Sequence, residues 1–107
     1  MSKEPTIDIT LQETGNRGRY EARLAGKDAV GELTYSRQGA ATLLADHTGV
    51  PDALRGQGVG QALVQRLVND ARKNGLKVVP VCPFVRAMWK RHPEWSGVMV
   101  NGDQKPV

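Results

Sequence analysis

The chain has 107 residues, of which 39% are hydrophobic and 24% charged, enough for one domain with a modest core and unlike a disordered chain. The net charge of +4 favours anionic partners, including nucleic acid, phosphorylated cofactors and acidic surfaces, although plain solubility explains it equally well. One cysteine excludes an internal disulfide, and we expect neither a signal peptide nor a membrane-spanning segment. We therefore expect one cytoplasmic domain over residues 1–107, frayed at 1–5 and 102–107, with no membrane partner.

The first half of the chain has the period-two alternation of β-strands. The alternating runs are residues 6–12, 19–24, 29–36 and 41–47, and short segments rich in turn-forming residues separate them. Connections this short favour an antiparallel meander of successive strands.

The pattern then changes to helical spacing. Residues 58–74 place apolar side chains along one stripe, which predicts a long amphipathic helix, and Gly75 is suited to end it. Residues 77–81 predict a short buried strand. Pro80 within that strand indicates an unpaired side or a bulge at this point.

The last elements are short. Pro83 suits the first position of a second helix, which would run to residue 91 and stop before Pro93. Residues 97–100 predict a further short strand. The expected order is four strands, a helix, a strand and a helix, in one α+β domain.

A glycine-rich turn lies between the fourth strand and the long helix. Its sequence is Arg55, Gly56, Gln57, Gly58, Val59, Gly60. The first N–H groups of a helix have no internal partner and carry partial positive charge, while glycine lets the backbone approach a ligand closely. The turn therefore predicts an anion site suited to a phosphate or pyrophosphate.

Two common phosphate-binding motifs do not fit this turn. A mononucleotide P-loop needs lysine and then serine or threonine after its last glycine, whereas Gln61 follows Gly60. A dinucleotide fingerprint needs glycine at its first, third and sixth positions, and a count from Gly56 or Gly58 finds none at the sixth. The structural alternative is that the glycines serve only tight packing.

The turn resembles the Arg/Gln-x-x-Gly-x-Gly/Ala signature of the GNAT N-acetyltransferase superfamily, and Arg55, Gly58 and Gly60 match its fixed positions. The resemblance implies acetyl-CoA as the cofactor, with its pyrophosphate held by main-chain N–H groups of the turn. The residues assigned to cofactor binding in this way are Val50, Arg55, Gly56, Gln57, Gly58, Val59, Gly60, Gln61, Cys82 and Phe84.

The resemblance extends over roughly residues 29–95. Segments 47–51, 79–85 and 90–94 are similar to the short single-domain branch of the superfamily. This implies a twisted, mostly antiparallel sheet of about five to six strands with two main helices packed on it, whose fourth and fifth strands splay apart to admit the pantetheine. Counterparts of the N-terminal helices that form the acceptor pocket in larger members are missing, which leaves room for a partner protein to complete that pocket.

Cys82 is one candidate catalytic residue. With Pro83 as the first helical residue, Cys82 occupies the N-cap, where the helix dipole favours a thiolate. In the resembling branch this cysteine lies near the thioester, from which a thiolate could accept the acetyl group and pass it to an amine. The alternative is a small buried hydrophobic residue.

His47 is the second candidate. The usual GNAT mechanism needs a general base that takes a proton from the amine, which then attacks the thioester directly. His47 and Asp46 end the fourth strand and are the best-placed base or water relay, although they could equally satisfy the following turn with hydrogen bonds. For His92, before a proline, we favour a helix-ending role. We expect no metal site, because two histidines and one cysteine lack the close spacing of metal ligands.

A basic, aromatic stretch near the C-terminal end also fits a nucleic-acid-binding surface. Cations and aromatic side chains alternate there as on nucleic-acid surfaces, at Arg86, Trp89, Lys90, Arg91 and Trp95. A simpler interpretation is a helix with solvated cations, some of which meet the phosphates of CoA. The sequence thus favours an acetyl-CoA-dependent N-acetyltransferase with an unidentified amine acceptor. The alternatives are a non-catalytic CoA-binding module and, less favoured, a nucleic-acid-binding domain.

Overall fold

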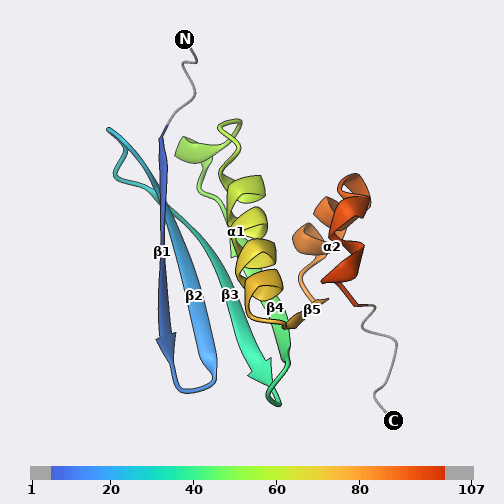
Figure 1. Ribbon diagram of the computed structural model, residues 1–107. Helices are drawn as coiled ribbons and strands as arrows, with labels where there is room; N and C mark the ends of the chain where they lie inside the picture. Colours follow the sequence, from blue (N-terminus) through green and yellow to red (C-terminus); the bar gives the residue numbers. More distant parts are fainter. Residues whose placement is uncertain (1–5, 101–107) are drawn as a thin grey trace.

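A computed structural model describes residues 6–100, which form a five-stranded sheet and two α-helices (Figure 1). The strands are β1 (Ile7–Thr14), β2 (Arg17–Leu24), β3 (Val30–Gln38), β4 (Thr42–Gly49) and β5 (Lys77–Pro80). The helices are α1 (Val59–Lys73) and α2 (Pro83–Arg91), with 3₁₀ helices at Asp52–Leu54 and Pro93–Gly97. The fraying expected at 1–5 and 102–107 lies outside the described residues.

The sheet is a meander in which β1 to β4 pair antiparallel in chain order and β5 joins β4 in parallel. Alternation sets which side chains face the core. In β2, for example, Tyr20, Ala22 and Leu24 are buried, whereas the alternate residues Arg19 and Arg23 are exposed. The α+β class and the mostly antiparallel sheet are therefore confirmed, with strand boundaries within two residues of those expected for β1 to β4.

The expected strand at residues 97–100 is wrong. Residues Pro93–Gly97 form a 3₁₀ helix instead, which places the side chain of Trp95 in the core. Beyond it, Met99 makes only an isolated parallel bridge to Val78. The N–H groups of Val98 and Met99 donate to the Trp95 carbonyl, whereas the Val98 carbonyl and the Val100 N–H both pair with Val78, so the pairing with β5 is confined to this bridge.

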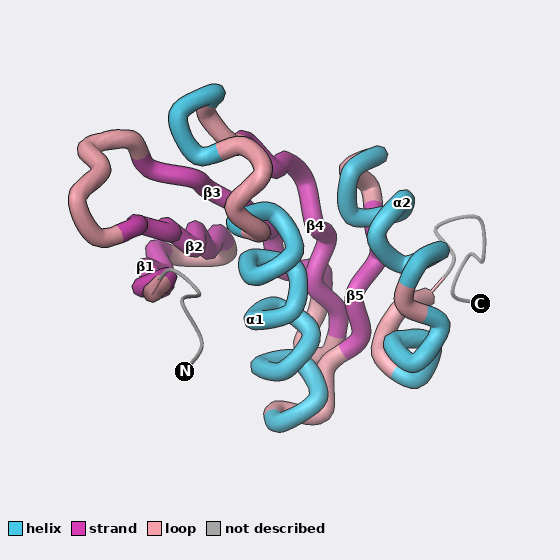
Figure 2. The backbone as a smooth tube through the Cα atoms, turned by 90° about the horizontal axis from the view of Figure 1, so that it is seen from above, coloured by secondary structure: helices cyan, strands magenta, loops and turns pink. Residues whose placement is uncertain are grey.

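Helix α1 covers one face of the sheet, and α2 lies beside β5 (Figure 2). The buried stripe of α1 is Val59, Gly60, Leu63, Val64, Leu67, Val68 and Ala71. The helix ends as Gly75 predicts, because the N–H of Gly75 donates to the Arg72 carbonyl and that of Leu76 to the Ala71 carbonyl. Neither helix within residues 6–100 is both long and apolar enough to span a bilayer. The cytoplasmic location stays a prediction.

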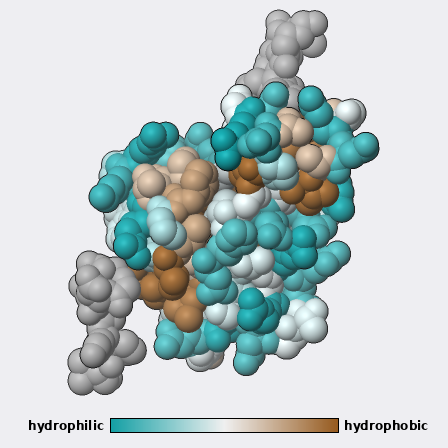
Figure 3. All heavy atoms as spheres, turned by 180° about the vertical axis from the view of Figure 1, so that it is seen from behind, coloured by the Kyte–Doolittle hydropathy of each residue, from teal (hydrophilic) through white to brown (hydrophobic). Residues whose placement is uncertain are grey.

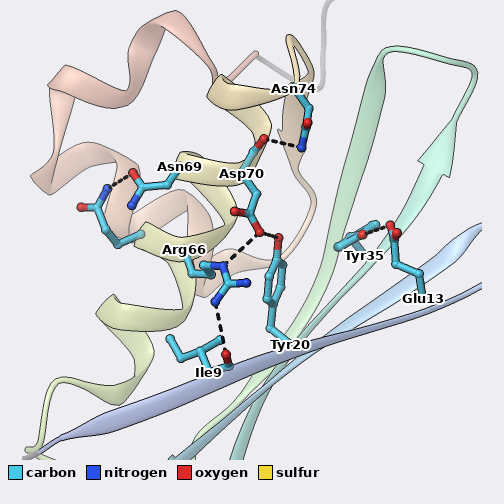
Figure 4. Close-up of polar contacts among 9 residues, drawn as sticks. Ile9, Glu13, Tyr20, Tyr35, Arg66, Asn69, Asp70 and Asn74 are labelled. Atoms are coloured by element: carbon cyan, nitrogen blue, oxygen red, sulfur yellow. Dashed lines mark hydrogen bonds and ion pairs between the residues drawn. The ribbon is translucent and has the colours of Figure 1, made fainter.

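A polar network fastens α1 to the strands beneath it (Figure 4). The hydroxyl of Tyr20 donates to Oδ2 of Asp70 at 2.7 Å, and Arg66 Nε donates to the same oxygen at 3.1 Å. Arg66 also donates to the carbonyl of Ile9 in β1. Burial and the Asp70 carboxylate raise the pKa of Tyr20 well above its ordinary value, so the hydroxyl stays protonated and remains a donor.

A second tyrosine uses the same chemistry within the sheet. The Tyr35 hydroxyl donates to the Glu13 carboxylate, which also accepts from Arg37 at 2.8 Å. Burial, together with the hydrogen bond to Glu13, raises the pKa of Tyr35 to about 12. The Tyr35 bond, and next the Arg37 bond, lower the pKa of Glu13. The hydroxyls of both buried tyrosines, Tyr20 and Tyr35, are thus held by charge-assisted hydrogen bonds to carboxylates.

Candidate functional site

The site begins where β4 and β5 separate. The two strands pair from Thr42 and Lys77 to Ala45 and Pro80, and the N–H of Cys82 then donates to the Ala45 carbonyl at 2.8 Å. Beyond this bond the chain of β5 turns into α2, whereas β4 continues to Gly49. Within residues 6–100, β4 beyond Ala45 therefore has a strand partner on its β3 side only. An open strand edge can accept an extended ligand through main-chain hydrogen bonds.

A β-bulge in β4 decides which side chains face this opening. Thr34 pairs with His47 and Tyr35 pairs with Ala45, so Asp46 is an extra residue without a partner in β3. Without the bulge, alternation would send His47 to the same face as Ala45. With it, Thr48 takes that inner face, and His47 turns to the outer one.

The glycine-rich turn has the geometry of a helix N-terminus prepared for an anion. Leu54 is fully buried and anchors the segment before the turn. Gly58 is the N-cap of α1 with φ of 77°, a left-handed conformation that side chains with a Cβ rarely adopt. Arg55 Nε lies 3.1 Å from Oδ1 of Asp52, but the Arg55 side chain is 74% exposed. Its guanidinium therefore remains accessible to a ligand, as do the unpaired first N–H groups of the helix.

Gly60, the second residue of α1, allows close approach of α2. A Cβ at Gly60 would lie 2.5 Å from Cζ of Phe84, a distance that no real contact sustains. The ring of Phe84 therefore packs directly over the backbone of the α1 N-terminus. It remains 38% exposed, because its other face borders open space.

These elements enclose a cleft of about 510 Å³ between the α1 N-terminus, β4 and α2. It is lined by Thr48, Val50, Leu54, Arg55, Gly56, Gly58, Val59, Gly60, Gln61, Phe84, Met88 and Arg91. The residues that the family resemblance assigns to cofactor binding line this cleft, except Gln57 and Cys82. Its walls combine apolar side chains with two arginines, as a site for a long ligand with an anionic end requires.

Cys82 lies next to the cleft rather than in its wall. Its side chain is 5% exposed, and Sγ lies 3.6 Å from the hydroxyl of Thr48, which does line the cleft. Cys82 is the N-cap of α2 with Pro83 as the first helical residue, as the sequence predicts. The Thr48 side chain therefore lies between the thiol and the cleft.

His47 lies on the other face of the sheet. Its side chain is 61% exposed, and Nε2 lies 3.4 Å from Oε2 of Glu32 in β3. Glu32 in turn accepts from Arg19 at 2.9 Å. Hydrophilic residues cover much of the side opposite α1, where this group lies (Figure 3). The structure therefore places the glycine-rich turn in the lining of the cleft and Cys82 next to it, whereas His47 lies on the other face of the sheet.

The neighbouring Asp46 and His92 have local partners. Asp46 accepts from the Ser36 hydroxyl at 3.2 Å, which caps the bulge. His92 stacks on Trp95 with ring centroids 4.3 Å apart and contacts Glu94 at 3.0 Å. These contacts account for both residues without a role in the cleft.

Comparison with known proteins agrees with this geometry. The family described as GCN5-related N-acetyl-transferase matches residues 19–98, about three quarters of the chain. The chain belongs to the GCN5-related N-acetyltransferase family. It is 28% identical to Protein NATD1 of Xenopus tropicalis over 92 residues, which cover 86% of this chain and 84% of that protein. It is 27% identical to Protein NATD1 of Homo sapiens over 90 residues, which cover 84% and 80% of the two chains.

A solved structure of the same family has the same fold. The solution structure of a GCN5-like protein from Staphylococcus aureus aligns with a TM-score of 0.67 at 29% sequence identity. The alignment covers 89% of this chain and 91% of that one. The superfamily resemblance and the fold expected from the sequence are thus confirmed.

Four residues that line the cleft are not in the set assigned to cofactor binding from the sequence: Thr48, Leu54, Met88 and Arg91. Of these, only Arg91 was considered there, as one of several cations that could meet the phosphates of CoA. Met88 and Arg91 follow Phe84 at intervals of four and three residues, which is one face of a helix, so the spacing carried a signal. For Thr48 no local signal exists, because the bulge at Asp46 sets its direction.

The basic, aromatic stretch does not present both its tryptophans to solvent. Trp95 is 1% exposed, and the indole N–H of Trp89 donates to Ser96 at 3.1 Å. A buried ring cannot stack on a nucleic-acid base. Of the cations in this stretch, Arg91 lines the cleft.

Proposed function

We propose that this protein is an acetyl-CoA-dependent N-acetyltransferase that acts on an amine acceptor. The observation that carries the proposal is the cleft that joins the α1 N-terminus to the separated strands, with the thiol of Cys82 beside it. Family membership supports the reaction class. The acceptor is an amine of unassigned structure.

Each part of the cofactor has a matching surface. The pyrophosphate fits the unpaired N–H groups at the N-terminus of α1, with Arg55 as an additional cation. The pantetheine is an extended chain with two amides, which suits the open edge of β4 beyond Ala45. Phe84 and Val50 offer apolar contact along the way. This arrangement directs the thioester toward Thr48 and Cys82.

We further propose that Cys82 carries the acetyl group. In the first step Sγ of Cys82 attacks the carbonyl carbon, the bond from that carbon to the CoA sulfur breaks, and the proton of the Cys82 thiol ends on the departing CoA thiol. In the second step the neutral amine attacks the Cys82 thioester, which yields the amide and restores the thiol. Direct attack of the amine on acetyl-CoA gives the same products without the intermediate.

A non-catalytic CoA-binding module is the second candidate, and the exposure of His47 favours it. An acetyltransferase needs a general base that meets the amine, and a histidine that is 61% exposed on an open sheet face has no enclosed acceptor site around it within residues 6–100. A partner protein that covers this face could complete the site. Replacement His47→Gln separates the candidates. Loss of transfer with unchanged CoA affinity supports the enzyme with His47 as its base.

Calorimetric titration of the whole protein with acetyl-CoA and with CoA, at low and moderate salt, is the first test. Micromolar one-to-one binding that persists at moderate salt supports the cofactor assignment. A panel of amines, with release of free CoA thiol as the readout, then tests turnover. Absence of binding, or weak binding lost with salt, would refute the proposal and favour a polyanion ligand.

A further inference from the structure

One face of α2 forms a wall of the cleft. Phe84, Met88 and Arg91 lie at successive intervals of four and three residues and all line the cleft. The wall is therefore apolar at its start and cationic at its end. Arg55 and Arg91 are the two charged residues of the lining, which contains no carboxylate among residues 6–100.

The two arginines lie on different walls. Arg55 belongs to the turn before α1, whereas Arg91 is the last residue of α2. Cys82 caps the opposite end of α2, and at about 1.5 Å rise per residue Arg91 lies roughly 13 Å from it along the helix axis. A ligand with its thioester near Cys82 thus meets Arg91 at the end remote from the reaction.

We infer that Arg91 binds the 3′-phosphate on the ribose of coenzyme A and so selects the phosphorylated form of the cofactor. This inference rests on the proposed function. The pyrophosphate already has the N–H groups of the α1 N-terminus, and the 3′-phosphate is the remaining anion of the ligand. A guanidinium matches a phosphate with two parallel hydrogen bonds. Arg91 makes no ion pair within residues 6–100, so that fork is available.

The neighbouring Lys90 provides a control for a purely structural role of Arg91. A cation in the last turn of a helix is stabilised by the helix dipole, and Lys90 occupies that turn as well. Lys90 is exposed and does not line the cleft. Replacement Lys90→Gln therefore removes the same charge from the same helix end without touching the cleft.

The test is a titration cycle with two ligands and three proteins. Coenzyme A and its 3′-dephospho form are titrated into the wild-type chain, Arg91→Gln and Lys90→Gln, after thermal unfolding has shown that all three fold. We expect the wild type to bind coenzyme A about 10- to 100-fold more tightly than the dephospho form, as a charge-assisted contact implies. Arg91→Gln should lose this preference by weakening only the coenzyme A complex. Lys90→Gln should retain it.

The possible results distinguish failure of the Arg91 inference from failure of the proposed function. Equal weakening of both complexes by Arg91→Gln would place Arg91 at the pyrophosphate and overturn the inference. An unchanged preference in Arg91→Gln, or an equal loss in Lys90→Gln, would reduce Arg91 to a helix-end or long-range charge. If the wild type binds neither ligand, the proposed function fails and the inference fails with it. If the wild type binds both equally, the inference alone fails.

Discussion

The Sγ of Cys82 lies 3.6 Å from the Oγ1 of Thr48, across the gap where β4 and β5 diverge. This contact joins the N-cap of one helix to the strand residue just after a bulge. Thr48 lines the cleft and Cys82 is only 5% exposed, so the thiol is shielded from solvent but lies next to the cleft. The thiol is thus positioned by packing from both sides of the opening.

The first prediction concerns that thiol. Replacement Cys82→Ala should lower the transfer rate by at least about 100-fold, the contribution typical of a positioned catalytic group, while the affinity for CoA stays near the wild-type value. Steady-state kinetics and calorimetry measure the two effects. Intact mass of the wild type after mixing with acetyl-CoA should show one acetyl group, absent from the variant. Full activity in Cys82→Ala would leave direct attack as the mechanism.

The second prediction concerns the approach of the two helices. Replacement Gly60→Ala places a Cβ 2.5 Å from the Phe84 ring, and we expect the ring to move away, because it is the partly exposed partner of this contact. We expect CoA affinity to fall at least about 10-fold, since the displaced Phe84 ring lines the cleft in which the cofactor is proposed to bind. The free energy of unfolding should change by less than about 1 kcal/mol. The higher helix propensity of alanine stabilises α1, whereas the contact with Phe84 destabilises it, and the two effects offset each other.

Gly97→Ala is the matched control for Gly60→Ala. A Cβ at Gly97 meets nothing within 4 Å, and this glycine does not line the cleft. Its CoA affinity should equal that of the wild type. Normal affinity in Gly60→Ala as well would show that the cofactor does not pass Phe84.

The third prediction concerns the network between α1 and the sheet. Replacement Tyr20→Phe keeps the buried ring and deletes the hydroxyl that donates to Asp70. A hydrogen bond to a charged group contributes about 1.5–3 kcal/mol, so the free energy of unfolding in urea should fall by about that amount. CoA affinity should be unchanged, since neither residue lines the cleft. An unaltered unfolding midpoint would mean that Arg66 alone satisfies Asp70.

The fourth prediction concerns pH. The folded state raises the pKa of Tyr35 from 10.0 to about 12, so its contribution to stability is complete below pH 10 and is lost as the pH rises through about 12. Its partner Glu13 has a lowered pKa, so the same hydrogen bond contributes fully above pH 4.5 and weakens as the pH falls below that value. Unfolding free energies measured across both ranges should fall at each end.

Replacement Tyr35→Phe tests the assignment. The variant should lose part of the alkaline fall in stability, while the part due to Tyr20 remains. A tyrosinate absorbance titration of the folded wild type should show ionisation above the ordinary value of 10.0. Ionisation of both tyrosines at that value would contradict the buried hydrogen bonds.

Local signals in the sequence predicted the elements that depend on neighbours in the chain. The turn around Gly58 and the end of α1 at Gly75 were predictable, because capping and left-handed glycines are local features. The strand expected at residues 97–100 was wrong, because the 3₁₀ helix extends to Gly97 and its bonds to the Trp95 carbonyl leave only a single bridge to Val78.

Relationships between distant residues were beyond such signals. Tyr20 and Asp70 are 50 positions apart, and only the packing of α1 on β2 brings them together. The direction of Thr48 depends on the pairing of β3 with β4, which no pattern within β4 reveals. Arg91 had the helical spacing of the cleft wall, but its role depended on the position of α2.

The unpaired Asp46 makes this stretch of the gene tolerant of a change in length. Loss of that single codon would join Ala45 directly to His47, and regular alternation would still direct His47 to the outer face of the sheet and Thr48 to the inner one. A hydroxyl would still meet Cys82, and an imidazole would still meet Glu32. In an alignment of relatives, a gap at this position therefore marks a strand without the bulge rather than a change in the side chains that face the cleft.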